Sequence, residues 1–262
     1  MNNKSAFSFL DGVSVCVALI LCEFAASAQD FSSFTKNAPW LQGFFAEMAP
    51  STPEFSAVGE MKMCDTDGAT QFVLPMELSV STNCLRWDAD IMKIWPLPPQ
   101  VTAAAKLTHT DKMTTITRID TKQMFVIYPG IQAYVQYPIS NQVLDEVNTL
   151  KTATELQKTE LAQETVNDHL CMKTRVVELK PHPQTTTNDY VWYAADLQQF
   201  PVRMELHTKG QMLKFDFQTV HVGTPDASVF EIPTNYLAFA NNAELMSYVK
   251  QKFQGSLDTA PK

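Results

Sequence analysis

The chain has 262 residues, a formal net charge of −8, and a hydrophobic fraction of 45%. An acidic chain without a basic run lacks the electrostatic footprint of a nucleic-acid-binding protein, so that class is excluded. No linker, repeat or low-complexity tract divides the sequence, and we therefore expect one domain.

Residues 1–28 have the features of a secretory signal peptide. Lys4 gives a positive start, residues 13–21 are largely apolar, and Ala26-Ser27-Ala28 supplies small residues before a cleavage point. The apolar stretch is shorter than the about 20 residues of a membrane-spanning helix. We expect cleavage after Ala28 and a periplasmic or secreted mature chain, residues 29–262, without a transmembrane segment.

Cys22 offers an alternative to simple cleavage, which is a lipid anchor on an acylated cysteine. That processing needs a small residue just before the cysteine, and Leu21 is bulky. Cleavage at the small-residue site is therefore favoured over anchoring through Cys22.

The first predicted element of the mature chain is a helix at residues 39–48. Trp40, Phe44, Phe45 and Met48 form a helical stripe behind a proline suited to the first turn. A second helix is predicted at residues 99–108, after the proline-rich loop 95–99. Near the end of the chain, Asn241 and Glu244 form a capping-box pattern before a third helix. Its stripe is Leu245, Tyr248, Val249 and Phe253, and Gly255 is expected to end it.

Strands dominate the rest of the chain. Apolar and polar residues alternate at 76–81, 85–91, 202–207 and 213–218, and weaker patterns mark 55–63, 113–119, 123–128, 133–137, 172–179 and 190–195. Residues 157–163 fit either a helix or a strand, and a strand is preferred. Turn signals separate these segments at 67–68, 129–130, 181–183 and 209–210. An alternation of period two predicts an antiparallel sheet of roughly ten strands with one apolar and one wet face.

A long sheet with one apolar face must bury that face, and the few short helices leave curling as the economical solution. The predicted fold is therefore mainly β (α+β). A single strongly curved antiparallel sheet forms an incomplete barrel, and a few short helices cover or plug its apolar face. Such a shell tends to enclose an apolar cavity.

Several short motifs give the sequence a family resemblance. They are Arg118-Ile-Asp120, Tyr128-Pro129 with Ala133-Tyr134, residues 164–171 around His169 and Cys171, residues 192–203, and residues 229–236 around Phe230 and Pro233. In this order, over roughly residues 55–237, they resemble the LolA/LolB-like superfamily of lipoprotein carriers and receptors, and most of all an uncharacterised secreted bacterial branch of it.

The resemblance implies an incomplete barrel with a helical lid and a cavity that, in the carriers, holds the acyl chains of lipoproteins. It therefore implies a lipid or a lipidated protein as partner. One position departs from the family pattern, because Asp168 stands where a glycine usually precedes the His-x-Cys step. Aspartate tolerates the left-handed backbone that a turn there needs, so we expect the turn to be kept.

Aromatic residues and methionines on the strands are the candidate cavity lining. The candidates are Trp87, Trp95, Phe125, Tyr134, Trp192, Met204, Phe215 and Phe217. Flexible thioethers suit an adaptable binding surface. Ordinary core packing remains the alternative, because aromatic residues on the apolar face of a sheet usually fill a core.

The sequence contains only weak motifs for catalysis or metal binding. The spacing of His169 and Cys171 would put both side chains on one face of a strand, but the other histidines add no metal-ligand pattern. No catalytic residue, metal site or cofactor is therefore predicted. In an exported chain Cys64 and Cys84 could form a disulfide, and three buried free thiols are the alternative.

The sequence thus favours an exported cell-envelope binding protein whose apolar cavity accepts an acyl chain, a lipid or a lipoprotein segment. Two other functions stay open. One is a structural or interaction protein of the envelope whose core is filled by its own side chains. The other is an exported hydrolase, which the absence of a catalytic motif disfavours.

Overall fold

A computed structural model describes Phe45 and residues 48–145, 156–178, 189–208 and 211–258 of the chain. The strands are β1 (Phe55–Asp65), β2 (Thr70–Val80), β3 (Cys84–Asp90), β4 (Lys112–Arg118), β5 (Gln123–Tyr128), β6 (Ala133–Pro138), β7 (Leu156–Val166), β8 (His169–Glu178), β9 (Asp189–Ala194), β10 (Phe200–Thr208), β11 (Gln211–Val222) and β12 (Leu237–Phe239). The helices with described bounds are α4 (Pro99–Leu107) and α6 (Asn242–Asp258), with 3₁₀ turns η1 (Ile91–Lys93), η2 (Pro129–Ile131), η3 (Ala195–Leu197) and η4 (Ala227–Phe230). Residues 141–145 are also helical.

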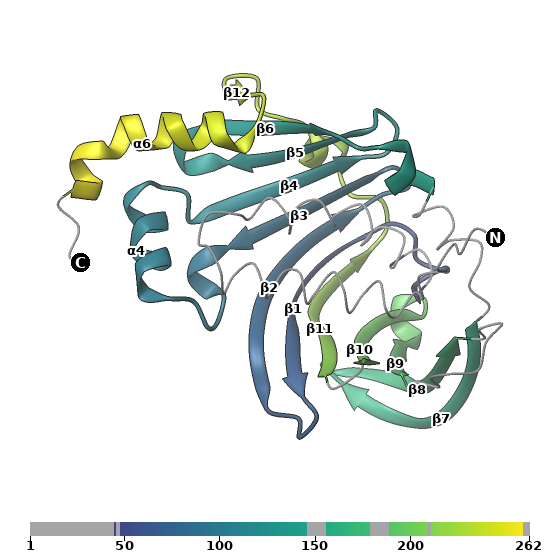
Figure 1. The fold of residues 1–262 in the computed structure, drawn as a ribbon. Helices are drawn as coiled ribbons and strands as arrows, with labels where there is room; N and C mark the ends of the chain where they lie inside the picture. The colour runs from purple at the N-terminus through teal and green to yellow at the C-terminus, as the bar shows by residue number, and fades with distance from the viewer. Residues whose placement is uncertain (1–44, 46–47, 146–155, 179–188, 209–210, 259–262) are drawn as a thin grey trace, which may run out of the picture.

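All twelve strands belong to one sheet, in the order β12-β6-β5-β4-β3-β2-β1-β11-β10-β9-β8-β7. The sheet bends strongly between β12 at one end and β7 at the other and does not close into a barrel (Figure 1). This confirms the predicted curved, mainly β fold. It also adds β12, which runs parallel to β6 and makes the sheet mixed.

We call the side of the sheet that carries Leu85, Trp87 and Val126 the inner face, and the opposite side the outer face. These three residues belong to the largest buried hydrophobic cluster, which extends from β6 to β7. Because paired residues of neighbouring strands point to the same side, the strand registers assign each side chain to one face.

Strands β1 and β11 approach each other closely at Gly59. The register shifts between Val58 and Gly59, as in a β-bulge, and a Cβ atom at Gly59 would lie 2.3 Å from the carbonyl oxygen of Asp216. Only glycine fits this contact. The bulge therefore supplies local bending in the middle of the curved sheet.

The turn between β7 and β8 keeps the expected geometry in spite of Asp168. Asn167 and Asp168 have φ values of 49° and 66°, and Val166 pairs with His169 across them, as in a type I′ hairpin. Asn167 also donates hydrogen bonds of 2.6 Å to the Asp216 carboxylate and 2.7 Å to the Phe217 carbonyl. Because the β10–β11 ladder stops at the Arg203–Asp216 pair, Asn167 satisfies a β11 carbonyl that lies beyond the ladder.

Residues 223–236 form a strap that crosses the outer face from β11 to β12. At its start the Thr224 hydroxyl donates to Glu54. Farther along, the Arg86 guanidinium donates to the Val229 carbonyl at 2.8 Å while it holds Asp88 through two further hydrogen bonds. Phe230 then packs on the outer face. The strap thus links the centre of the sheet to its β12 edge.

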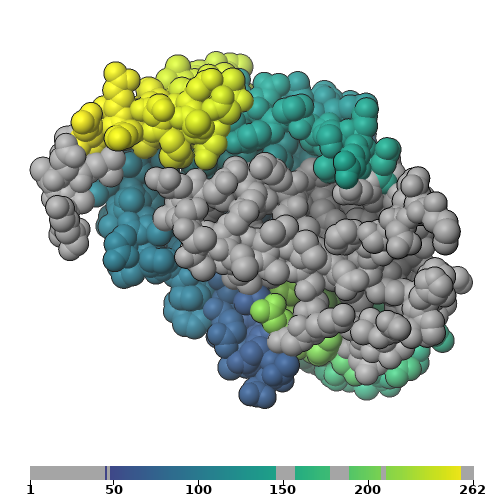
Figure 2. Space-filling view, in the orientation of Figure 1, coloured from purple at the N-terminus to yellow at the C-terminus, as the bar shows by residue number. Residues whose placement is uncertain are grey.

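Helix α6 lies along that edge, close to α4 (Figures 1 and 2). Its capping box is confirmed, because the Glu244 amide donates to the Asn241 side chain at 2.9 Å and the Asn241 amide group donates back to Glu244 at 3.1 Å. The predicted end at Gly255 is wrong, since the helix runs to Asp258. One glycine costs a helix only about 1 kcal/mol relative to alanine, too little to stop it.

The predicted helix at residues 39–48 lies mostly outside the described residues, and Phe45 and Met48 are both helical and buried. The predicted signal peptide also lies outside them. Within the described part of the chain, no helix is both long and apolar enough to span a lipid bilayer.

Cys64 and Cys84 do not form the disulfide considered from the sequence. Cys64, Cys84 and Cys171 are free thiols. The register places Cys64 opposite Thr70, at one end of β2, whereas Cys84 follows the turn after Val80, at the other end. A disulfide needs Cα atoms within about 7 Å, and a strand of this length holds these ends far beyond that distance.

We expect Gly59→Ala to destabilise the fold by about 1–3 kcal/mol, because the new methyl group would overpack against the β11 backbone. The midpoint of urea unfolding, followed by circular dichroism, measures this loss. Val58→Ala, at an exposed position on the same strand, is the control with a small expected change. A Gly59→Ala midpoint equal to that of the control would contradict the close contact.

Glu54 should make stability depend on pH. Hydrogen bonds from the hydroxyl of Thr224, and then from Thr82, lower the pKa of this carboxyl group below its usual value. A lowered folded-state pKa contributes stability above the unfolded pKa of about 4.3, which is lost as the pH falls through the folded value. Glu54→Gln should therefore reduce the free energy of unfolding near pH ~7 and have little effect below pH ~3. An effect of equal size at both pH values would refute this role.

Candidate functional site

The inner face is the candidate binding surface because it is continuous, apolar and rich in methionine. Its cluster contains six of the twelve methionines of the chain: Met48, Met61, Met63, Met76, Met113 and Met204. Unbranched thioether side chains change rotamer easily and fit irregular partners. The inner face therefore combines a large apolar area with adaptable side chains.

Four of the predicted lining residues meet on this face. Trp87, Met204, Phe215 and Phe217 are each no more than 2% exposed. Met204 pairs across the strands with Phe215, which in turn pairs with Met61. Trp87 lies farther toward the β12 edge, opposite Leu78 of β2. The structure thus brings half of the predicted set onto one surface.

At one end of the inner face the aromatic rings pack on one another. The ring centroids of Phe55 and Phe200 lie 4.8 Å apart, and those of Phe200 and Phe217 lie 5.6 Å apart. Phe45 adds an edge contact to Phe55 at 5.4 Å. Such edge-to-face pairs are favourable beyond the burial of their area, so the protein's own side chains fill this end.

Two hydroxyl groups interrupt the inner face near Trp87. Thr115 and Thr117 are both fully buried, and Thr115 pairs with Trp87 on one side and Val126 on the other. Neither hydroxyl oxygen has a hydrogen-bond partner in the described parts of the chain. Leaving a buried hydroxyl unpaired costs about 1–3 kcal/mol. Sequence analysis missed both residues, although the period of two places them on the same face of the strand as Met113.

Phe125 and Tyr134 lie on the outer face and line no inner surface. Phe125 pairs with Ile116, and both pack with Phe230 of the strap. Tyr134 contacts the Phe125 ring, with the centroids 6.1 Å apart. These two residues form a second core beneath the strap, so the placement predicted for them differs from the observed one.

Trp192 also faces the outer side, where it is held by charged groups. Its indole Nε1 donates to Glu164 at 2.8 Å, and the ammonium group of Lys173 lies 4.7 Å from the ring centroid. This hydrogen bond, together with the nearby Lys173 charge, lowers the pKa of Glu164. Trp192 is therefore an anchor of the outer surface and does not line the inner face.

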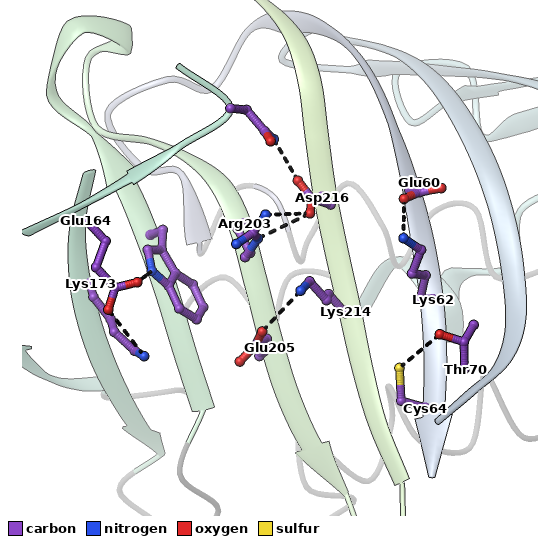
Figure 3. A network of polar contacts seen from close by, with 12 residues as sticks. Glu60, Lys62, Cys64, Thr70, Glu164, Lys173, Arg203, Glu205, Lys214 and Asp216 are labelled. Atoms are coloured by element: carbon purple, nitrogen blue, oxygen red, sulfur yellow. Dashed lines mark hydrogen bonds and ion pairs between the residues drawn. The ribbon is translucent and has the colours of Figure 1, made fainter. Parts of the chain in front are cut away.

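This contact belongs to a row of charged pairs that crosses the outer face from β7 to β1 (Figure 3). Arg203 binds Asp216 at 2.8 Å, and Lys214 lies 3.5 Å from Glu205. Partly exposed pairs of this kind are each worth about 1 kcal/mol or less. Their main effect is to keep this part of the outer face polar while the inner face is apolar.

Trp95 does not lie on the inner face and is 55% exposed; it pairs with Val73, which is on the outer side of β2. Its backbone exchanges two hydrogen bonds with Val73, of 2.6 and 3.0 Å, which fix the loop before α4. The indole therefore points out of the core, and Trp95 does not join the predicted lining.

His169 and Cys171 do not make a nucleophile–base pair. The Cys171 thiol donates to the backbone carbonyl of His169 at 3.4 Å, while the imidazole Nδ1 contacts the Asp196 carboxylate at 2.7 Å. Burial raises the pKa of the Cys171 thiol, which keeps it in the unreactive protonated form. This geometry tightens the corner between β8 and η3.

A shallow groove of about 600 Å³ lies at the β5–β6 end of the sheet. Its lining is Thr121, Lys122, Gln123, Gln136, Pro138, Ala238, Phe239 and Ala240, none of which was predicted. Within the described ranges, no cluster of three His, Cys, Asp or Glu residues is arranged to hold a metal ion.

No protein-family model matches this sequence, and no curated protein matches it. Solved structures do match. An uncharacterized conserved protein from Thermus thermophilus is 10% identical, with a TM-score of 0.41 over 78% of this chain and 97% of that chain. MucB is 10% identical, with a TM-score of 0.37 over 76% of this chain and 63% of MucB.

The Mycobacterium tuberculosis lipoprotein LppX is 11% identical, with a TM-score of 0.37 over 72% of this chain and 98% of LppX. At identities near 10% and TM-scores below 0.5, these likenesses transfer neither a family nor a function to this chain. The resemblance to the LolA/LolB-like superfamily therefore stays a prediction from the sequence motifs.

Proposed function

We propose that this chain is an exported binding protein of the cell envelope that holds an acyl chain, a lipid or a lipidated protein segment against its inner face. The observation that carries the proposal is the gathering of Met61, Met76, Met113 and Met204 with Trp87 on one face of a curved, open sheet. An apolar ligand would gain by the area it removes from water, at about 25 cal/mol per Å².

The features of residues 1–28 support export, and the proposed partners are a lipid or a lipidated protein. We infer a binding role in preference to catalysis because the Cys171 thiol is protonated and contacts a backbone carbonyl. If the protein were instead a hydrolase that uses this pair, His169→Ala or Cys171→Ala would abolish its activity.

A second candidate is an envelope structural or interaction protein whose core is complete without a ligand. The ring packing among Phe45, Phe55, Phe200 and Phe217 favours it, because that end of the inner face is already filled. The two candidates differ in whether the region around Trp87 takes up a ligand, and this difference is measurable.

Quenching of tryptophan fluorescence by a bound brominated lipid tests whether a ligand lies beside Trp87. Among the described tryptophans, Trp87 is the one on the inner face, whereas Trp192 is on the outer face and Trp95 is in a loop. A palmitoyl-length fatty acid brominated on its chain should quench the emission saturably. Trp87→Phe should remove most of this quenching, and Trp192→Phe should keep it.

The protein for this test is the full chain, exported by a bacterial host and purified without detergent. Native mass spectrometry of the same sample should show a discrete added mass that resolves into a lipid after denaturation. A bare protein mass together with no saturable quenching would reject the proposal in favour of the self-filled core.

A further inference from the structure

We propose that the hydroxyl groups of Thr115 and Thr117 are the polar contact of the inner face and donate hydrogen bonds to the carbonyl oxygen of an acyl ester or amide. This inference rests on the proposed binding function and names the chemistry of the ligand. The recognised group would be the carbonyl at the head of the ligand's acyl chain, and the hydrocarbon part of the ligand would lie on the methionine-rich surface beside it.

The two hydroxyls are placed together by the strand. Residues two apart on a strand share a face and lie about 7 Å apart, and both positions pair with inward-facing residues of β3 and β5. Strand β4 lies between β3 and β5. The backbone groups of these two neighbours are used in the hydrogen bonds of the sheet and do not serve the two hydroxyls. The two side chains are left without a partner in the described chain.

The surroundings select a neutral acceptor. Thr115 lies between Trp87 and Val126, and Thr117 lies between Leu85 and Met124. No lysine or arginine in the described residues is buried. Lys158 of β7, which the register with Val176 places on the inner face, lies over the Tyr193 ring, at the other end of the sheet from β4. The cross-strand neighbours of Thr115 and Thr117 therefore offer no counter-charge to a phosphate or a free carboxylate. A carbonyl oxygen accepts a hydrogen bond without carrying a net charge into this apolar site.

Thr114, on the same strand, is a threonine whose hydroxyl does have a hydrogen-bond partner. The Thr114 hydroxyl, on the outer face, donates to the Asp88 carboxylate. Valine has nearly the same shape as threonine and would remove an unpaired donor at positions 115 or 117. The ligand-free protein should therefore be stabilised by Thr115→Val and Thr117→Val and destabilised by Thr114→Val.

A matched pair of lipids tests the proposal. The two probes are lysophosphatidylcholines with the same headgroup and a sixteen-carbon chain, one linked by an ester and the other by an ether that lacks the carbonyl oxygen. Binding of each to the full chain is measured below the micelle concentration. The wild-type protein should prefer the ester by about fivefold to tenfold, the size of a hydrogen-bond contribution.

The double variant Thr115→Val/Thr117→Val should lose this preference by weakening the ester and leaving the ether unchanged. Thr114→Val is the control on the same strand and should keep the preference. Because the readout is a ratio within each variant, a general change in stability does not imitate it.

Equal binding of the two probes by the wild type, or a preference retained in the double variant, would overturn the role of the hydroxyls and leave the proposed function standing. Failure of the wild type to bind either probe, together with the absence of bromolipid quenching, would overturn both. If the wild type binds neither probe but is quenched by the brominated fatty acid, only the ester recognition fails.

Discussion

The structure depends on burying one apolar face across a sheet of twelve strands. A flat sheet of this width would need a second layer of equal width, whereas the described helices α4 and α6 have only 9 and 17 residues. Curvature reduces the area that has to be covered, and it requires points where the ladder can bend. Gly59 supplies one such point because its missing side chain lets β1 approach the Asp216 carbonyl. Asn167 completes the hydrogen bonds where β10 leaves β11.

The strap of residues 223–236 follows from the same constraint. The outer face is polar from β7 to β1, where charged pairs cross it, but it is apolar over β4 and β5. Phe230 covers that apolar area, and Arg86 fixes the strap by joining Asp88 and the Val229 carbonyl in one network. Because the strap ends in β12, the cover of the outer face also positions α6 at the sheet edge.

The sequence predicted the fold more completely than the site, for a physical reason. Alternation of apolar and polar residues identifies a strand that faces solvent on one side. The sequence predicts such strands correctly for β2, β3, β10 and β11. It also places Trp87, Met204 and Phe215 on the correct face. In β5 and β9 the apolar residues are continuous because both faces are covered, so period two no longer tells which side chain points inward. Phe125 and Trp192 lie on these two strands. The three-residue β12 is too short to carry a pattern.

The two ends of the inner face differ in what they would gain from a ligand. Around Phe55 and Phe217 the rings already contact each other, so a ligand there would have to break favourable contacts. Around Trp87 the inner face carries Leu78, the thioethers of Met76 and Met113, and two hydroxyls that lack a partner among the described residues. Rearranging a methionine costs little, and pairing a buried hydroxyl recovers a desolvation penalty. If a ligand binds, the free-energy balance therefore puts its carbonyl at β4 and its chain over β2 and β3, away from the ring cluster.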